Sequence, residues 1–204
     1  MNKIRILLLG NGGQLGWEAH RQLFCLGDVF AFDFPEIDMT QPNKIIELIE
    51  NVKPDLIYNA TAYTAVDKAE NDFENAKLVN AITPAEIGKY CFKFKIGLIH
   101  ISTDYVFDGE KGSDYTEEDI PNPLNVYGST KWEGEKYVQQ SGCAHLIFRT
   151  SWVYSRRKAG FLQKVIDWAK SNPELRIVDD QIGNPTWARM LAILSTSFLN
   201  SSEI

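Results

Sequence analysis

Tyr127 and Lys131 lie four residues apart in the segment "NPLNVYGSTKWEGEKYV" (122–138). The segment predicts a helix, and residues four apart on a helix share a face, so both side chains can act on one bound molecule. A phenol, with an unperturbed pKa near 10, is a weak acid–base group at neutral pH unless a nearby cation favours its ionised form. We therefore expect Lys131 to lower the pKa of Tyr127 and to hold a redox cofactor by its ribose. Tyr127 would then give a proton to a carbonyl oxygen as hydride reaches its carbon.

The same spacing occurs again at Tyr154 and Lys158, and roughly half a chance match is expected in a chain of this composition. Tyr154 lies in a basic, turn-like segment, whereas Tyr127 opens a helix, so we assign the chemistry to Tyr127. The preceding apolar run "GLIHISTDYVF" carries Ser102 and Thr103 at the end of a strand. Thr103 can hydrogen-bond the same substrate oxygen. The competing interpretation is that both hydroxyls satisfy the backbone at the strand end.

A glycine-rich turn, "GNGGQLG" (10–16), precedes the first predicted helix. Gly10, Gly13 and Gly16 lack a Cβ, so backbone N–H groups and the helix N-terminus can approach a pyrophosphate. Asp33 follows about 20 residues later, where an acid would accept hydrogen bonds from an adenosine ribose. Its charge would repel a 2′-phosphate, which favours NADH over NADPH but leaves the use of both open. The competing interpretations are a tight turn without a ligand and a solvated Asp33.

The elements that must position these residues follow from the apolar pattern. Strands are predicted at "IRILLLG", "VFAFDF", "DLIYNA", "GLIHIS", "HLIFRTS" and "LRIVDD". Helices are predicted over 14–26, 43–51, 72–93, 126–140, 161–170 and 187–199, with Pro84 expected to break or kink the third. This alternation predicts an α/β fold with a doubly wound, Rossmann-like parallel sheet, whose ligands bind beyond the carboxyl ends of the strands.

The composition bounds the class of protein. The chain has 204 residues, 44% hydrophobic and 24% charged, so we expect one globular domain. A net charge of −6 argues against general affinity for nucleic acid or an anionic membrane. Cys25, Cys91 and Cys143 form no CxxC pair and predict reduced thiols, and the three histidines have no metal-ligand spacing. The first apolar run is too short to span a bilayer and lacks a signal-peptide pattern, so a cytoplasmic protein is expected.

Six ordered motifs resemble one enzyme family. They are "GNGGQLG", "NATAYTAVDKAE", "STDYVFDG", "NVYGSTKWEGEK", "FRTSWVY" and "DQIGNPT". Together they span nearly the whole chain and resemble the dTDP-4-dehydrorhamnose reductase family of the extended short-chain dehydrogenases. The resemblance implies NAD(P)H-dependent reduction of the 4-keto group of dTDP-4-dehydro-6-deoxy-L-mannose to dTDP-L-rhamnose, a precursor of surface polysaccharide.

The resemblance also implies roles for individual residues. Tyr127 would be the proton donor, Lys131 its partner on the cofactor ribose, and Thr103 the hydroxyl that tunes the tyrosine. Thr103 and Asp104 would reach the sugar, as would Trp152, for which a core tryptophan is the competing interpretation. Cofactor contacts are implied for Gly10, Gly13, Gln14, Leu15, Gly16, Asp33, Asp38, Met39, Ala62, Tyr63, Thr64, Tyr127 and Lys131. Some members of the family use a divalent ion such as Mg²⁺, but no carboxylate cluster here places one.

One departure from the family leaves a second function open. Family members continue beyond "DQIGNPT" with a portion that helps to build the substrate lobe, whereas this chain ends at Ile204. We therefore expect a single NAD(P)-binding domain over 1–204, with elements of an incomplete substrate lobe near 152–204. The alternative is a non-catalytic dinucleotide-binding or regulatory subunit, which would not need the tyrosine and lysine. A dehydratase is disfavoured because Tyr105 stands where its glutamate is expected, and a homodimer is compatible with either function.

Overall fold

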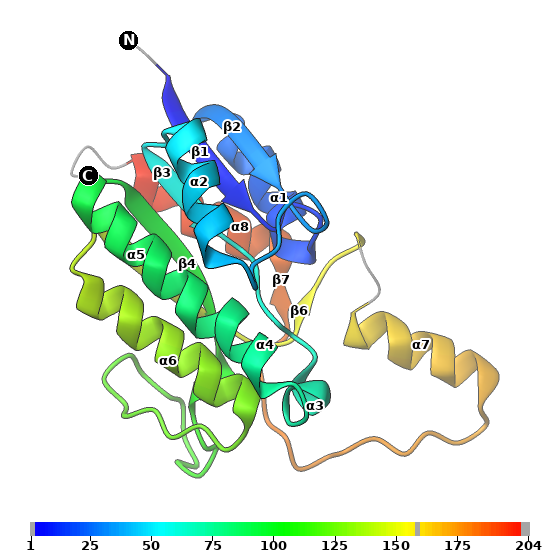
Figure 1. Ribbon diagram of the computed structural model, residues 1–204. Coiled ribbons are helices and arrows are strands. Elements are labelled where there is room, and N and C mark those ends of the chain that lie inside the picture. Colours follow the sequence, from blue (N-terminus) through cyan, green and yellow to red (C-terminus); the bar gives the residue numbers. More distant parts are fainter. Residues whose placement is uncertain (1–2, 158–159, 201–204) are drawn as a thin grey trace.

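The computed structural model describes residues 3–157 and 160–200, and its centre is a five-stranded sheet with helices on both faces (Figure 1). The strands run in the order β2-β1-β3-β4-β5, and all neighbouring pairs are parallel. They span β1 (Ile4–Leu9), β2 (Gly27–Phe32), β3 (Leu56–Asn59), β4 (Gly97–Thr103) and β5 (His145–Thr150). The expected doubly wound parallel sheet is confirmed.

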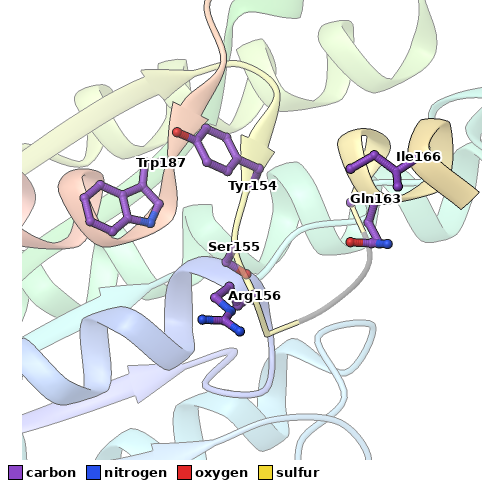
Figure 2. Close-up of a pocket in the computed structure, with 7 residues that line it drawn as sticks. Tyr154, Ser155, Arg156, Gln163, Ile166 and Trp187 are labelled. Carbon is purple, nitrogen blue, oxygen red and sulfur yellow. The ribbon is translucent and has the colours of Figure 1, made fainter.

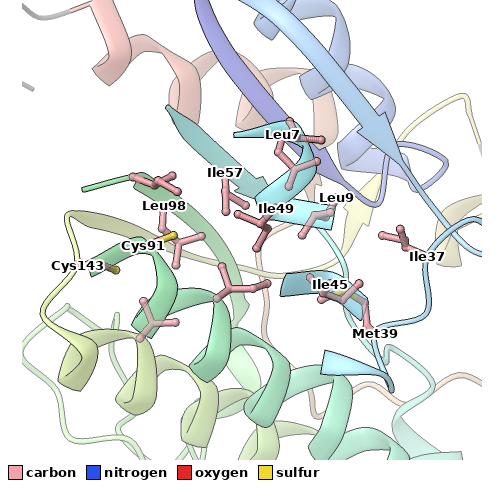
Figure 3. Packing of buried hydrophobic residues seen from close by; sticks show 14 residues of the cluster. Leu7, Leu9, Ile37, Met39, Ile45, Ile49, Ile57, Cys91, Leu98 and Cys143 are labelled. Carbon is pink, nitrogen blue, oxygen red and sulfur yellow. The ribbon is translucent and has the colours of Figure 1, made fainter. Parts of the chain in front are cut away.

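One face of the sheet is covered by α2 (Pro42–Val52), α5 (Thr83–Phe94) and α6 (Val126–Ser141). Buried apolar side chains from β1, β3, β4 and these helices form one cluster between the layers (Figure 3). Leu7, Ile49 and Ile57 are fully buried in it. A strand buried on both faces must be apolar throughout, which explains why the strand sequences are continuous hydrophobic runs rather than alternating ones.

The other face is covered by α1 (Gln14–Leu23) and α8 (Ala188–Ser197), which pack against each other. Ile6, Leu8 and Tyr58 point into this second cluster. The hydroxyl groups of Tyr58 and Ser195 lie 2.8 Å apart, so a strand at the centre of the sheet is hydrogen-bonded to the last helix. The C-terminal helix is therefore part of the core, although it is more than 120 residues away from β3 in sequence.

The helical run predicted over 72–93 consists of three segments. They are α4 (Phe73–Lys77), a π-helical turn η1 (Leu78–Ile82) and α5, and a short helix α3 (Val66–Ala69) precedes them. Pro84 does not break the run, because it occupies the first turn of α5, where its missing N–H is tolerated. The irregularity lies one turn earlier, in the π turn, and such turns are common at functional positions.

The C-terminal third departs most from the predictions. Segment 175–180 forms no strand; it runs as a loop that does not pair with β5, the edge of the main sheet. A separate two-stranded sheet, β6 (Val153–Tyr154) with β7 (Thr186–Trp187), was not predicted. Helix α7 (Phe161–Ser171) projects away from the sheet (Figure 1), and a 3₁₀ turn, η3 (Phe198–Asn200), follows α8.

The three cysteines are free thiols. Cys25 is exposed at the end of the α1 region, whereas Cys91 on α5 and Cys143 before β5 are buried in the first cluster (Figure 3). Burial raises the pKa of Cys91 to about 12. Among the described residues, no helix has the length and apolarity needed to cross a bilayer.

Candidate active site

The glycine-rich turn links β1 to α1 and leaves no room for side chains. Gly10 adopts φ +90°, and a Cβ there would lie 3.1 Å from the backbone of Ala60. A Cβ on Gly16 would collide with the carbonyl oxygen of Gly10. The N-cap residue of α1 is Gly13, which makes no side-chain cap, so the first-turn N–H groups face outward from a turn that only glycine can form. This arrangement fits the pyrophosphate of a dinucleotide.

Asp33 follows β2 at the rim of this turn. Its carboxylate accepts hydrogen bonds from the N–H of Gly12 at 2.9 Å and from the N–H of Phe34 at 2.8 Å. The acid therefore holds the glycine turn in shape, in addition to lying where a ribose is expected. A parallel fold places the turn that contains Gly12 close to Asp33, so this second role could have been inferred once the fold was predicted. The sequence motif alone does not predict it.

Four of the expected cofactor contacts are engaged within the protein. The amide of Gln14 donates to the carbonyl of Val153 at 2.9 Å and accepts from Ser155 at 3.1 Å, so it ties the glycine turn to β6. Leu15 is buried in the second cluster. The carboxylate of Asp38 accepts three hydrogen bonds from Thr40 and Gln41, which lower its pKa, and Met39 is buried in the first cluster.

Tyr127 lies near Thr103 at the carboxyl end of β4. Asn125 caps α6 by accepting from the N–H of Gly128 at 2.7 Å, so Tyr127 lies in the first turn and Lys131 one turn further along the same face. Thr103 is close enough to Tyr127 to lower its pKa. The structure thus places Tyr127 beside Thr103, and Lys131 follows on the same face of α6.

The electrostatics of the pair differ from the expectation. Burial raises the pKa of Tyr127 to about 12, and the nearby hydroxyl of Thr103, which lowers it, only partly offsets this. Lys131 is 1% exposed, and its ammonium donates to the carbonyl of Ile101 at 2.6 Å. Burial lowers the pKa of Lys131 to about 8. The expected lowering of the tyrosine pKa was wrong for this geometry, because desolvation outweighs the other influences on the phenol.

The segment Ala62, Tyr63 and Thr64 follows β3 and is held by Asn80 in the π turn. The amide of Asn80 accepts from the N–H of Tyr63 at 2.9 Å and donates to Thr130 on α6 at 3.1 Å. Thr130 in turn donates to the carbonyl of Tyr127 at 3.0 Å. Asn80 was missed in the sequence, although a lone amide within the apolar stretch "LVNAI" is a signal of a buried hydrogen-bonding role.

A cavity of about 640 Å³ opens beside this site. Trp152 lines it, is 39% exposed and adopts φ 43°, a strained conformation for a bulky residue, so it is not a core tryptophan. The other lining residues are Tyr105, Val153, Tyr154, Phe161, Trp168, Arg176, Ile177, Val178, Gln181 and Pro185. Asp104 precedes Tyr105, and burial raises its pKa although Thr103 donates to it at 3.0 Å. The apolar residues of 175–180 therefore line a cavity instead of forming a strand.

A smaller cavity of about 180 Å³ is also lined by β6 (Figure 2). Tyr154, Ser155 and Arg156 line it, together with Gln163 and Ile166 from α7 and Trp187 from β7. Tyr154 thus lines both cavities. The second residue of its spacing match, Lys158, lies outside the described residues.

The doubly wound parallel sheet, the glycine turn after β1 and the tyrosine–lysine pair on α6 are together typical of the Rossmann-like class to which the extended short-chain dehydrogenases belong. Within that class, the chain belongs to the family described as RmlD substrate binding domain, which matches residues 4–203. The family resemblance inferred from the motifs is confirmed.

Known relatives agree with this assignment. The chain is 44% identical over 193 residues to the dTDP-4-dehydrorhamnose reductase of Escherichia coli (strain K12), covering 93% of this chain and 64% of that protein. The solved dTDP-4-dehydrorhamnose reductase of Clostridium acetobutylicum superposes with a TM-score of 0.91 at 35% identity, covering 97% of this chain and 70% of that one. That of Bacillus anthracis, solved in complex with NADP, gives 0.92 at 32% identity, covering 98% and 72%. The chain thus spans less than two thirds of its curated Escherichia coli relative.

Proposed function

We propose that this chain carries the catalytic centre of an NAD(P)H-dependent dTDP-4-dehydrorhamnose reductase, which reduces the 4-keto group of dTDP-4-dehydro-6-deoxy-L-mannose to give dTDP-L-rhamnose. The observation that carries the proposal is the placement of Tyr127 near Thr103 at the end of β4, with Lys131 one turn further along the same face of α6, beside the cavity lined by Tyr105 and Trp152. A module that only binds a dinucleotide would not need an acid–base pair at that edge. The curated relatives with the same name support the substrate.

In the proposed reaction, Tyr127 donates its phenolic proton to the keto oxygen. Its raised pKa keeps the proton on the phenol at neutral pH, so the residue enters the reaction in its acid form, and Thr103 would stabilise the phenolate by turning its hydroxyl from Asp104 to Tyr127 as the proton leaves. Lys131 would hold the ribose of the cofactor and supply positive charge there. When bound, the reduced nicotinamide supplies hydride to the carbonyl carbon. The glycine turn and Asp33 would hold the dinucleotide in register with these groups.

The proposal extends to the domain organisation, the cellular compartment and the oligomeric state of the protein. We propose one dinucleotide-binding domain over 1–204, with the elements from residue 152 onward contributing the sugar side, since Trp152 and α7 line the large cavity. Free Cys91 and Cys143 are compatible with a reducing cytoplasm. A homodimer is part of the same proposal, and light scattering of the purified chain tests it.

The decisive experiment is an assay of NADH and NADPH oxidation by the 204-residue chain with dTDP-4-dehydro-6-deoxy-L-mannose as substrate. Each cofactor is titrated by calorimetry in parallel, and Tyr127→Phe is the matched control. Turnover by the parent, lost in the control, supports the reductase.

Cofactor binding without turnover would favour the non-catalytic alternative or an incomplete sugar site. A chimera that appends the C-terminal portion of the Escherichia coli relative separates these two outcomes, because only the incomplete site gains turnover. Failure to bind either cofactor would contradict the proposal as a whole.

A further inference from the structure

Glu135 is a buried carboxylate on the same face of α6 as Lys131, one helical turn further along. Its side chain is 1% exposed, and the guanidinium of Arg149 on β5 donates to both of its oxygens, with Nη2 to Oε2 at 2.7 Å and Nε to Oε1 at 3.1 Å. None of the roles proposed above uses this pair. Removing a carboxylate from water this completely is costly unless paired charges and hydrogen bonds compensate.

Arg149 is itself fixed on two sides. Its guanidinium lies 4.9 Å from the ring centre of Phe107 and 5.7 Å from that of Trp132. Phe107 stacks on Tyr115 with ring centres 4.2 Å apart. A planar guanidinium held between aromatic rings and bonded to both carboxylate oxygens leaves Glu135 little freedom to turn away.

The groups around Lys131 come from three elements. On α6 they are Tyr127, whose pKa is raised to about 12, and Glu135, whose field raises the pKa of Lys131 against the effect of burial. On β4 it is His100, whose pKa is held well below its ordinary value by burial, so the imidazole is uncharged. On β5 it is Arg149, which is already paired with Glu135. Asp104, in the turn after β4, acts on Tyr127.

We infer that Glu135 is a positioning residue of the reaction centre: its carboxylate, oriented by Arg149 and one helical turn from Lys131, keeps the buried ammonium of Lys131 charged. The catalytic role of the Lys131 charge rests on the proposed function. The effect of Glu135 on that charge does not depend on the proposed function. In this scheme α6 contributes an acid, a cation and the counter-charge of that cation at three successive turns of one face, which are Tyr127, Lys131 and Glu135.

The test reads the charge of Lys131 directly. The full chain is labelled with ¹³Cε-lysine, and the Lys131 resonance is identified by its absence in Lys131→Arg and followed by NMR across pH. In the parent we expect a midpoint near 8. In Glu135→Gln we expect it about one pH unit lower, as for the loss of one nearby opposite charge. Glu135→Asp, which keeps the charge, should hold the midpoint close to that of the parent.

Glu133→Gln is the matched control. It removes a carboxylate from the same helix, but Glu133 is bonded to Tyr137 and Lys77 and faces away from Lys131, so the midpoint should not move. An unchanged midpoint in Glu135→Gln would overturn the inference. If that variant unfolds, Glu135→Gln combined with Arg149→Met avoids leaving the guanidinium unpaired, and its midpoint is compared with that of Arg149→Met alone, so that the two variants differ only in the carboxylate; equal midpoints in the two would overturn the inference.

Turnover gives an independent second reading. If the parent is active, the alkaline limb of its kcat/KM profile should shift to lower pH in Glu135→Gln by the same amount as the NMR midpoint, which a purely structural role would not produce. An inactive parent would count against the proposed function alone, because the NMR titration needs neither substrate nor cofactor.

Discussion

At the scale of single residues, Asp33 has two jobs that can be separated by substitution. It faces the expected ribose and also accepts from the N–H of Gly12. Asp33→Asn keeps an oxygen for that N–H but loses the charge that would repel a 2′-phosphate. We expect the ratio of kcat/KM for NADPH over NADH to rise roughly tenfold, equivalent to about 1.4 kcal/mol.

Asp33→Ala should change preference in the same direction but also loosen the glycine turn, so that both cofactors bind less tightly by calorimetry. Equal affinity losses for NADH and NADPH in Asp33→Asn, without a change in their ratio, would contradict the assignment of this acid to the ribose.

Tyr127→Phe removes the proton that the keto oxygen would receive and leaves the ring in place. We expect turnover to fall by about 10²–10⁴-fold while cofactor affinity stays within experimental error of the parent. The edge-to-face contact of this ring with Tyr105, at 5.6 Å between centres, survives the substitution, so the fold should be intact by circular dichroism. Full activity in this variant would show that α6 is not the catalytic helix.

The types and spacing of residues were enough to predict where the candidate side chains lie, but not their ionisation. Tyr127 and Lys131 share a face of α6 and Thr103 ends β4, because helix periodicity and strand ends are local properties. The pKa values depend on how much protein covers each group, and burial is a property of the whole packed layer. The same reason explains why the pairing of Glu135 with Arg149, from different elements, was not anticipated.

At the scale of elements, α6 is held to the π turn by a close backbone approach. A Cβ on Gly134 would collide with the carbonyl oxygen of Asn80, so Gly134→Ala must push α6 away from η1. We expect a loss of about 1–3 kcal/mol in the free energy of unfolding, measured with urea, and lower turnover, because Asn80 also holds Thr130 and Tyr63.

Gly97→Ala is the control for this prediction. Its Cβ would lie 3.3 Å from a methyl group at the flexible end of Leu56, which can move aside. A loss of stability in Gly97→Ala as large as that in Gly134→Ala would mean that the contact with Asn80 is not what makes Gly134 necessary.

Helices and strands were predictable where their pattern is self-contained. The five strands of the sheet and the helices around them follow from apolar runs and 3.6-residue spacing. Segment 175–180 has the same composition as a strand, but its apolar residues Ile177 and Val178 line the large cavity and the segment pairs with no strand, and β6 and β7 are too short to carry a pattern. The π turn depends on the tertiary contact between Asn80 and α6, which no local rule encodes.

At the scale of the whole molecule, His100 links stability to pH. His100 is fully buried, and its Nδ1 lies 3.2 Å from the side-chain amide nitrogen of Asn59. Burial holds its pKa well below the ordinary value. The native state therefore does not bind the proton that the unfolded chain binds below about pH 6.5. The free energy of unfolding should therefore fall as the pH drops from about 6.5 to 5.5, with this residue contributing a slope of up to about 1.4 kcal/mol per pH unit.

Urea unfolding of the parent and of His100→Asn at several pH values measures that contribution. The variant should lose most of the slope in this window, whereas His20→Gln, on the outer part of α1, should keep it. Parallel slopes in the parent and in His100→Asn would show that His100 accepts its proton without unfolding.

The three thiols differ in exposure, so their rates of chemical labelling report how often the protein opens locally. Cys25 is exposed and should react with a thiol reagent at once, whereas Cys91 and Cys143 are sealed between α5 and the start of β5. Those two thiols can be modified only when the helical layer separates from the sheet. Their labelling rate in native buffer therefore measures how often this local opening exposes them. A bound dinucleotide that stabilises the closed sheet should slow this labelling while leaving that of Cys25 unchanged, and so ligand binding can be read without any catalytic event.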